Sequence, residues 1–494
     1  MNIEHFDVLI VGAGLSGIGA GVHLQKHSPG RTYAILEGRA RVGGTWDLFR
    51  YPGIRSDSDM YTLGYSFKPW EEAKAIADGP SILKYVKDTA RDYRIDAKIR
   101  YGHQVKRAAW SSADACWTVE AERGEARQIV RITCNFLFLC SGYYKYSEGY
   151  TPDFPGIGRF KGRIVHPQKW TDDISYEGKR VVVIGSGATA VTLVPEMAKK
   201  AAHVTMLQRS PTYVVARPAE DAVANWLRGH FPAMFAYVLS RWKRVLMQMY
   251  FFNLCRRKPQ HAKDLILGGV RAYLGPDYDV ATHFTPRYNP WEQRLCLVPD
   301  ADLFMAIRGK RASVVTDHID TFTETGIRLK SGAELEADLV VTATGLNLEV
   351  MGGLALTVDG ATVNPAKTFA YKGLMYSGVP NLANAFGYTN ASWTLKCDLT
   401  CEYVCRLLNH MQKNGYAQCT PHLDDPAMGE VPWVDFSSGY FQRSLDKFPK
   451  QGSKTPWKMP QNYARDIMTL RFGRIDDGVM VFSGPPAVRQ AKRA

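Results

Sequence analysis

Two glycine-rich stretches hold the residues of this chain that are best suited to binding phosphate groups. The first is Gly12-Ala13-Gly14-Leu15-Ser16-Gly17, which follows an apolar run and precedes apolar residues at helical spacing. In a G-x-G-x-x-G turn, Gly12 permits the tight bend, Gly14 lets the backbone approach a pyrophosphate, and Gly17 lets helix and strand pack closely. The N-terminus of the following helix offers free N–H donors to phosphate. The stretch therefore predicts a dinucleotide site.

An acidic residue ends the next expected strand. Residues 32–36 are mostly apolar and lead into Glu37, 20 residues after Gly17. A carboxylate at this position accepts hydrogen bonds from the ribose hydroxyls of a bound dinucleotide. Glu37 is therefore a candidate cofactor ligand of the first site.

The second stretch repeats this arrangement with one informative change. Gly185, Gly187 and Ala190 stand in the three motif positions after the apolar run 180–184, and alanine is tolerated in the third position. The next expected strand, 203–207, is followed by Gln208 and then Arg209 instead of an acid. Arginine attracts a 2′-phosphate, whereas an acid would repel it. We expect this second site to bind NADPH.

Both motifs need a strand before them and a helix after them, so the chain is expected to have an α/β fold. At 494 residues it is too long for a single core. We predict two Rossmann-like dinucleotide-binding domains with a helical insertion in the second. The expected boundaries are 1–150 and 346–494 for the first domain, 151–220 and 299–345 for the second, and 221–298 for the insertion.

Within the insertion, an apolar stripe recurs every three or four residues. It comprises Phe231, Met234, Phe235, Val238, Leu239, Trp242, Val245, Leu246 and Met249. This spacing predicts an amphipathic helix that packs on the protein body and roofs a substrate cavity. Because Arg241, Lys243 and Arg244 lie off the stripe, a basic amphipathic helix that contacts a membrane is an alternative. Apolar residues on the other faces also leave self-association into a homo-oligomer open.

The composition is that of a globular protein, and its charge favours small anionic ligands. The net charge is +14, but Lys and Arg are scattered, which argues against a nucleic-acid partner. The nine cysteines include no C-x-x-C pair, and Cys397, Cys401 and Cys405 are expected to be small buried hydrophobic residues. Neither a signal peptide nor a run of ~20 apolar residues is evident. We expect a cytoplasmic protein, with membrane association as the alternative.

Two further stretches are rich in aromatic residues and glycine. Residues 43–57 contain Gly43, Gly44, Gly53 and Pro52, and they are expected to form a shaped loop rather than a helix. Residues 160–170 lie between the two signatures and contain one histidine. This second stretch is expected to be the joint between the two cofactor domains.

Together the two stretches resemble the signatures of a known family. Phe160, Gly162, His166 and Trp170 fit the pattern F-x-G-x-x-x-H-x-x-x-W. Residues 43–57 fit the companion pattern [AG]-G-x-W-x-x-x-x-[FY]-P-[GM]-x-x-x-D at every specified position. Both are similar to the Baeyer–Villiger flavin monooxygenases. The longer runs 43–64 and 387–396 narrow the resemblance to a branch that includes ethionamide-activating enzymes.

The resemblance implies roles for individual residues. FAD would occupy the first site and NADPH the second, and His166 would link movement of the cofactor domains to turnover. Arg294 would be the catalytic arginine, with Asp57 the acid beside it. Gln293 stands where some relatives have a lysine that touches the NADPH phosphate, so Arg209 would carry more of that contact. Further cofactor contacts would come from Gly44, Thr45, Trp46, Asp47, Asp57, Tyr61 and Val105.

The implied reaction is oxygen insertion with NADPH and O₂. An anionic flavin peroxide would attack the carbonyl of a small apolar ketone to give an ester or lactone, and would also oxygenate a sulfide or thioamide. A buried peroxide anion needs a permanent cation and little water. Arginine keeps its charge, and burying it requires a carboxylate partner. We therefore expect Arg294 and Asp57 to be in contact.

Three other functions are consistent with two dinucleotide sites. A sulfur- or nitrogen-oxygenating flavin monooxygenase would yield S-oxides rather than esters. A disulfide reductase of similar fold is disfavoured because the chain has no C-x-x-C pair. A non-catalytic flavin-binding redox sensor that contacts membranes through residues 231–255 would consume little NADPH with any ketone.

Overall fold

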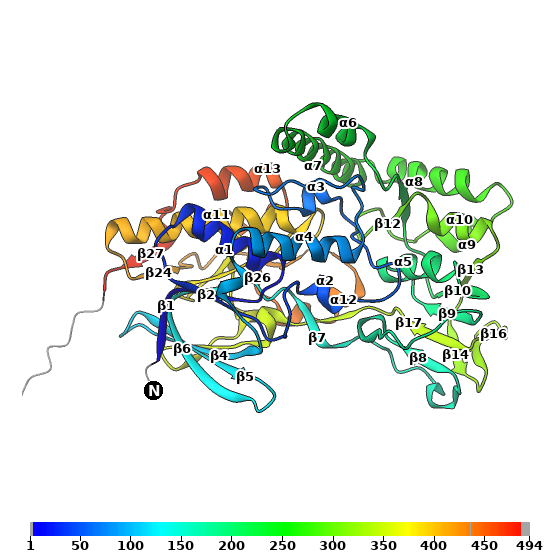
Figure 1. Cartoon of the computed structure of the whole chain (residues 1–494), viewed down its shortest axis with the longest axis horizontal. Coiled ribbons are helices and arrows are strands. Elements are labelled where there is room, and N and C mark those ends of the chain that lie inside the picture. Colours follow the sequence, from blue (N-terminus) through cyan, green and yellow to red (C-terminus); the bar gives the residue numbers. More distant parts are fainter. Residues whose placement is uncertain (1–2, 435, 486–494) are drawn as a thin grey trace, which may run out of the picture.

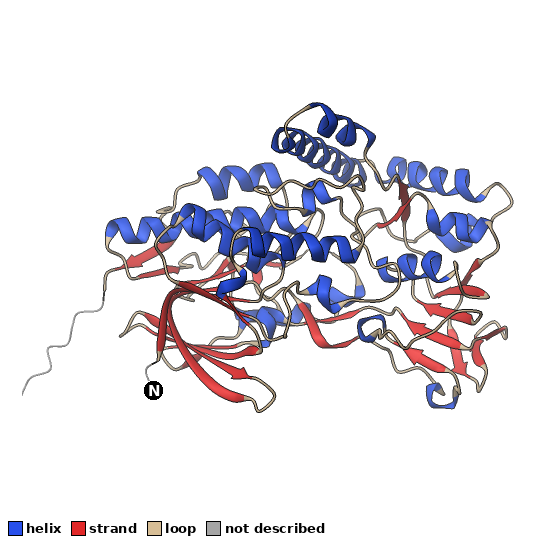
Figure 2. Cartoon of the chain, viewed as in Figure 1, coloured by secondary structure: helices blue, strands red, loops and turns tan. Residues whose placement is uncertain are grey.

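The computed structural model describes residues 3–434 and 436–485 of the chain (Figure 1). Two sheets lie at opposite ends of the molecule, and most of the long helices gather along one side of them (Figure 2). The larger sheet has nine strands and the smaller has five. This arrangement confirms the predicted α/β class with two dinucleotide-binding units.

The larger sheet is built around the first glycine signature. Its order is β20-β19-β4-β5-β6-β1-β2-β3, with β23 also paired to β6, and β1 runs parallel to both β2 and β6. Helix α1 follows β1 and packs against α11 (Trp393–Asn414). The bounds are β1 (Glu4–Val11), α1 (Leu15–His27), β2 (Tyr33–Leu36), β3 (Ile99–Arg100), β4 (His103–Ser111), β5 (Cys116–Arg123), β6 (Gln128–Leu139), β19 (Ala355–Val358), β20 (Ala361–Thr362) and β23 (Leu382–Asn384).

Strand β6 joins two features that the sequence suggests are separate. The alternating pattern up to Ile132 predicts a small meander, and the apolar run 136–140 predicts a return strand. The structure makes them one strand of 12 residues, paired with β5 in its first half and with β1 along most of its length. A single long strand thereby carries the chain from the meander back to the first glycine turn.

The smaller sheet is built around the second signature. Its order is β13-β10-β9-β17-β8, and every pairing is parallel. The predicted strand 180–184 and the predicted end of the next helix at Met197 match the structure. The bounds are β8 (Arg163–Val165), β9 (Arg180–Ile184), α5 (Ala188–Met197), β10 (His203–Gln208), α10 (Asp302–Arg308), β13 (Ala312–Thr316) and β17 (Leu339–Thr342).

The chain crosses between the two sheets at one antiparallel ribbon. Strand β7 (Tyr144–Gly149) leads from β6 to the smaller sheet, and β18 (Leu346–Leu348) leads back to the larger one. The two strands pair with each other, Leu346 opposite Gly149 and Leu348 opposite Tyr144. The domain boundaries that we propose near residues 150 and 345 fall at the end of this ribbon.

The insertion contains the helices that we expected, but helix α7 is turned the other way. The bounds are α6 (Ala222–His230), α7 (Ala233–Arg257), α8 (Pro259–Leu274) and α9 (Val280–Phe284), flanked by β11 (Val214–Arg217) and β12 (Cys296–Pro299). Seven of the nine stripe residues are exposed, by 39–58%. These seven, which we call the outward face, are Phe231, Met234, Phe235, Val238, Leu239, Trp242 and Leu246. The prediction that the stripe packs on the body is therefore wrong, and only Val245 is fully buried.

Polar contacts on the opposite side of α7 explain this orientation. Arg241, predicted to lie away from the body, is buried, and its Nη1 donates to the carbonyls of Tyr61 (2.9 Å) and Gly64 (2.8 Å). Its Nη2 lies 3.4 Å from Oδ2 of Asp398 on α11. A buried arginine needs such partners, because an unpaired buried charge is strongly destabilising. The helix therefore packs by its polar side.

The remaining elements surround these two bodies. Within the described residues, no helix is both long and apolar enough to span a bilayer. Cys397, Cys401 and Cys405 are buried on α11, as predicted. The other α-helices and paired strands of the described residues are α2 (Thr45–Leu48), α3 (Met60–Leu63), α4 (Gly79–Asp92), α12 (Gly439–Gln442), α13 (Tyr463–Asp466), β14 (Ile319–Phe322), β15 (Gly326–Leu329), β16 (Glu334–Glu336), β21 (Ala370–Tyr371), β22 (Met375–Tyr376), β24 (Gln418–Pro421), β25 (Glu430–Pro432), β26 (Lys450–Gly452) and β27 (Met480–Ser483).

Candidate active site

A large cavity of about 640 Å³ runs from the first glycine turn toward the smaller sheet. It is long enough to be lined by residues of both α1 and α5, including Leu15 and Thr189. Many of the predicted cofactor residues line it: Gly12, Gly14, Glu37, Gly44, Thr45, Trp46, Asp57 and Val105. The predicted catalytic residue Arg294 lines it as well.

The glycine turn has the shape that a pyrophosphate requires. Gly12 has a φ of +103°, and a Cβ there would lie 2.6 Å from the carbonyl oxygen of Cys140. Gly17 touches the same turn, since a Cβ would come within 1.8 Å of the Gly12 oxygen. Gly14 begins α1 without any side-chain cap. The first N–H groups of the helix are therefore left for a ligand, and an FAD pyrophosphate fits this turn.

Glu37 is held in place at the edge of the same cavity. Its Oε2 accepts a hydrogen bond from the backbone N–H of Ala13 (2.8 Å), and its Oε1 accepts one from that of Arg39 (2.9 Å). Burial raises the pKa of Glu37, and the two backbone donors offset part of that rise. The carboxylate is thus oriented beside the cavity, where the sequence predicts a ribose contact.

Residues 43–57 reach from one sheet to the other. Near its start, the stretch packs closely on the first glycine turn, since a Cβ added to Gly44 would lie 3.0 Å from the Cα of Gly14. Further along, a Cβ on Gly53 would lie 2.8 Å from the side chain of Glu196 on α5, and Arg55 forms an ion pair with Asp302 on α10. The stretch was expected to lack helix, but it contains the single turn α2. It brings Asp57 to the boundary between the two halves.

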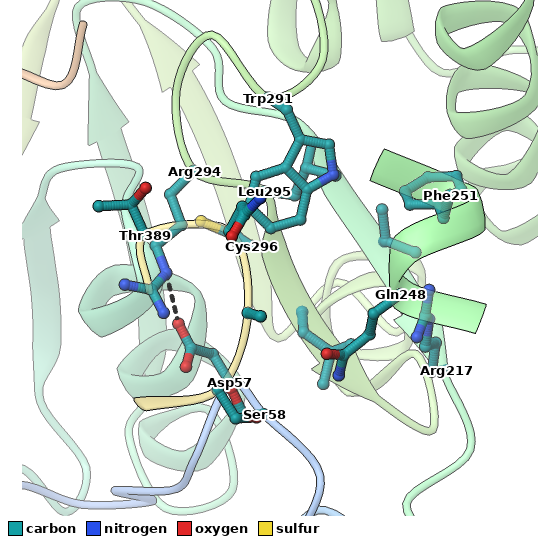
Figure 3. Close-up of a pocket in the computed structure, with 15 residues that line it drawn as sticks. Asp57, Ser58, Arg217, Gln248, Phe251, Trp291, Arg294, Leu295, Cys296 and Thr389 are labelled. Atoms are coloured by element: carbon teal, nitrogen blue, oxygen red, sulfur yellow. Dashed lines mark ion pairs between the residues drawn. The ribbon is translucent and has the colours of Figure 1, made fainter. Parts of the chain in front are cut away.

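Asp57 and Arg294 meet, as the sequence analysis predicts. Nε of Arg294 lies 2.8 Å from Oδ2 of Asp57 (Figure 3). Their side chains are 31% and 30% exposed, and both line the large cavity and a smaller one next to it. The carboxylate of Asp57 holds the pKa of Arg294 well above its ordinary value. A permanent cation therefore lies where the two cavities adjoin.

The smaller cavity, of about 90 Å³, lies beside this ion pair. Helix α7 contributes Gln248 and Phe251 to it, and β11 contributes Val215 and Arg217. Trp291 closes another side (Figure 3). Helix α7 therefore does roof a cavity, as predicted, although it does so with the side opposite its apolar stripe.

Three tyrosines around Arg294 were not found by sequence reasoning. Tyr143 and Tyr144 follow the end of β6, and their hydroxyls lie 3.0 Å apart. Burial raises the pKa of both and of Tyr440, while the charge of Arg294 offsets part of each rise. The pair at 143–144 could have been recognised, because it directly follows the small-residue turn Ser141-Gly142 at the carboxyl end of a central strand. Tyr440 belongs to no motif.

The second signature forms a turn like the first. Gly185 has a φ of +135°, and a Cβ there would lie 2.3 Å from the carbonyl oxygen of Ala343. Gly187 begins α5 without a side-chain cap, and Ala190 is buried in that helix. This turn therefore also leaves helix N–H groups for a phosphate.

Arg209 lies exposed after β10, with a second arginine nearby. Burial lowers the pKa of Arg443, and the charge of Arg209 lowers it further. The guanidinium of Arg443 lies 3.5 Å over the ring of Tyr150. The positive charges of Arg209 and Arg443 together favour the binding of an anion at this place. Gln293 is next to Arg294 in sequence but lines neither cavity.

Asp47 and Tyr61 are among the predicted cofactor residues that line neither cavity. The carboxylate of Asp47 is buried and forms ion pairs with Arg39, Arg41 and Arg50. Tyr61 is buried against Tyr237 of α7, with ring centroids 6.2 Å apart. In this structure both residues shape the surrounding protein, so cofactor contact by either stays a prediction.

The connector 160–170 is fixed to the ribbon between the sheets. Nδ1 of His166 accepts from the backbone N–H of Gln168 (3.2 Å), so Nε2 donates to the carbonyl of Gly345 (3.0 Å). The amide of Gln168 donates to the carbonyls of Lys145 and Tyr146 on β7. Phe160 and Trp170 are buried on either side, and a Cβ on Gly162 would lie 2.5 Å from the Phe160 ring.

Comparison with known proteins identifies the family of the chain. Residues 66–252 match the model of the flavin-binding monooxygenase-like family, and residues 10–77 match that of an NAD(P)-binding Rossmann-like domain. The chain is 54% identical over 485 residues to the FAD-containing monooxygenase EthA of Mycobacterium tuberculosis, covering 98% of this chain and 99% of that protein. The chain belongs to the flavin-binding monooxygenase-like family. The family resemblance that its motifs indicate is therefore confirmed.

Other relatives of this flavin-binding monooxygenase support the assignment. It is 47% identical to the probable FAD-binding monooxygenase AlmA of Acinetobacter baylyi, over 97% of this chain and 96% of that one. Its fold is similar to that of an oxidized steroid monooxygenase bound to NADP, with a TM-score of 0.76, 24% identity and coverage of 97% and 99%. The protein is therefore an FAD-dependent monooxygenase with two dinucleotide-binding units.

Proposed function

We propose that this monooxygenase inserts one oxygen atom of O₂ into a small apolar ketone at the expense of NADPH, giving an ester or lactone. The observation that carries the proposal is the Arg294–Asp57 ion pair, which lies where the large cavity adjoins the smaller one. A cofactor in the large cavity and a substrate in the smaller one would meet at this cation.

The two cofactors have separate places in this proposal. FAD would lie on the first glycine turn, with Glu37 beside its ribose, and NADPH on the second turn, with Arg209 and Arg443 near its 2′-phosphate. When bound, NADPH supplies hydride and the flavin ring activates O₂. The residues of this chain bind and orient the two cofactors and control the charge and water around them.

Arg294 would stabilise negative charge that develops on oxygen. Its guanidinium remains charged at all relevant pH values and presents several N–H donors in a fixed plane. Asp57 binds one edge through Nε, which fixes the direction in which the remaining donors point. The buried ring of Tyr143 and the partly buried ring of Tyr144 keep water from one side of the group, which strengthens the electrostatic effect.

The smaller cavity would select the substrate. Phe251, Trp291 and Leu297 give it apolar walls, and Gln248 and Arg217 add polar groups. Such a lining favours an apolar molecule with a single polar function. Because the same activated oxygen transfers readily to soft sulfur, a sulfide that fits the cavity would be oxidised to its S-oxide.

The test is a panel of linear, cyclic and aryl ketones together with a sulfide, in which NADPH consumption and product formation are both measured. We expect esters or lactones in proportion to the NADPH consumed. In Arg294→Ala, ester formation should fall by roughly 10²-fold or more, as when other enzymes lose an oxyanion-stabilising donor. The variant should still contain bound FAD by its absorbance.

The matched control is Arg294→Lys, which keeps the charge but not the planar donor fork, and should recover only part of the activity. Wild-type ester formation in Arg294→Ala would contradict the assignment. S-oxide without ester would indicate a sulfur-oxygenating enzyme, and negligible NADPH consumption with every compound would favour a redox sensor.

A further inference from the structure

Helices α6 and α7 form a projecting edge of the molecule, at the top of Figure 1. The outward face of α7 continues onto α6, since Trp226 lies 6.0 Å from Phe231 and Phe231 lies 5.5 Å from Phe235, centroid to centroid. Trp226 is 56% exposed, and Tyr250, near the other end of the face, is 71% exposed. From Phe231 to Tyr250 the face is about 30 Å long. Contiguous apolar surfaces of this extent mark interaction sites.

The charges beside this face are positive. Residues 222–258 contain seven Lys and Arg and no Asp or Glu. Arg241 points inward to Asp398, and Lys243 and Arg244 form ion pairs with Asp221. Arg257 and Lys258 are exposed at the end of α7. The face thus combines exposed Trp, Phe, Leu and Tyr side chains with exposed cations at one end.

We propose that the α6–α7 face docks on an anionic phospholipid bilayer. Apolar side chains enter the headgroup region, Trp and Tyr are favoured at that depth, and cations next to them are attracted to anionic lipids. The orientation of α7 serves this arrangement, because its polar side is held against the body by Arg241. The helix lies on the membrane in this proposal and does not cross it.

A second copy of the chain fits this face less well. A two-fold contact would place the face against itself. Neither α6 nor α7 carries an acid to receive the exposed cations of the other copy. The exposed acid Glu220 lies just before α6, and its carboxylate accepts a hydrogen bond from Asn225. An anionic lipid surface offers the complementary charge at the end of the face where Arg257 and Lys258 are exposed.

The experiment is co-sedimentation of the full-length, FAD-loaded protein with vesicles. Vesicles of phosphatidylglycerol and phosphatidylcholine are compared with vesicles of phosphatidylcholine alone, at low and high salt. We expect binding to the anionic vesicles that weakens as salt rises. The proposal does not rest on the proposed function, because sedimentation is read without turnover.

Three variants sharpen the result. Phe235→Gln combined with Leu246→Gln and Tyr250→Gln should weaken binding by at least about tenfold, since all three side chains are exposed and would enter the lipid. Arg257→Glu with Lys258→Glu should remove the preference for anionic lipid. Ile129→Gln, which changes a 54% exposed residue of β6 far from α7 in Figure 1, is the matched control and should bind like wild type.

The outcomes separate lipid from protein partners. Wild-type protein that stays in the supernatant with anionic vesicles would overturn the proposal, as would unchanged binding by the triple variant. A wild-type dimer that the triple variant converts to monomer, seen by light scattering without vesicle binding, would overturn it in favour of a second copy. Melting temperature and FAD content of each variant verify that it is folded.

Discussion

At the scale of single residues, the candidate active site depends on charged side chains that are fixed in position by hydrogen bonds or ion pairs. Arg294 is fixed by Asp57 at 2.8 Å and lies among the phenol groups of three tyrosines. Glu37 is fixed by two backbone donors. Arg209, in contrast, is exposed, forms no ion pair within the described part of the chain, and its charge lowers the pKa of Arg443. Charged groups that are fixed by partners suit a reaction centre. A cation without a carboxylate partner suits the binding of a negatively charged ligand.

Arg209 therefore gives a prediction about cofactor choice. In Arg209→Ala, kcat/KM with NADPH should fall roughly tenfold or more, because a charge-assisted contact contributes about 1.5–3 kcal/mol. With NADH, which lacks the 2′-phosphate, the same constant should stay nearly unchanged. Steady-state kinetics with both cofactors measure this.

The control for Arg209 is Arg159→Ala, another exposed arginine that belongs to neither glycine signature. It should not change the preference for NADPH. If wild-type protein uses NADH and NADPH equally well, Arg209 does not read the phosphate.

The residues of the site differ in how far sequence can reveal them. Glycine turns depend on a few neighbouring residues, so both signatures and Glu37 could be predicted directly. The contact between Arg294 and Asp57 could be predicted only through the family pattern, because the two residues are 237 positions apart in sequence. Tyr440 could not be predicted, since it reaches Arg294 from a C-terminal segment without a motif.

At the scale of elements, the connector 160–170 and the ribbon β7–β18 act as one joint. His166 binds Gly345 at the end of the return crossing, and Gln168 binds the outgoing strand β7. A Cβ on Gly149 would lie 1.9 Å from the imidazole, so ring and ribbon are in close contact. A rotation of one sheet against the other would therefore disturb these contacts.

The protonation of His166 should therefore affect stability. Burial lowers the pKa of His166 below its ordinary value of about 6.5. As pH falls below about 6.5, the unfolded chain takes up a proton that the folded chain does not, so stability falls with pH in that range. The melting temperature of wild type should thus drop more between pH 7 and pH 5 than that of His166→Gln, as followed by flavin fluorescence.

A functional measurement on the same residue completes this prediction. His166→Ala should retain FAD but release more H₂O₂ per NADPH, because the joint no longer aligns the two halves.

Curves of melting temperature against pH that run parallel in wild type and His166→Gln would show that the pKa of this histidine does not differ between the folded and unfolded states.

At the scale of the whole molecule, helix α7 connects the insertion to the first unit. Arg241 reaches the carbonyls of Tyr61 and Gly64 at the end of α3 and the carboxylate of Asp398 on α11. Asp398 also lies 3.3 Å from Nε2 of His23 on α1. Burial would raise the pKa of Asp398, but His23 and Arg241 together lower it. The orientation of α7 could not be predicted from its periodicity, because it depends on this distant buried pair and not on the stripe.

Breaking that pair should destabilise the fold. Arg241→Met removes the arginine partner of Asp398 and leaves two carbonyls without their donor, and should cost about 3–5 kcal/mol of unfolding free energy. The midpoint of urea unfolding measures this. Arg257→Met changes an exposed arginine of the same helix and should stay within about 0.5 kcal/mol of wild type. Equal midpoints for the two variants would mean that the buried pair does not hold α7.

The same pair has a consequence for synthesis of the chain. Arg241 precedes Asp398 by 157 residues, so at about 5–20 residues per second roughly 8–30 s pass before its carboxylate exists. During that interval the apolar stripe of α7 has already been synthesised, but Arg241 on the opposite side of the helix still lacks its carboxylate partner. Nascent chains are therefore exposed to self-association at this stage, and co-expression with a chaperone that covers α7 should increase the yield of dispersed protein.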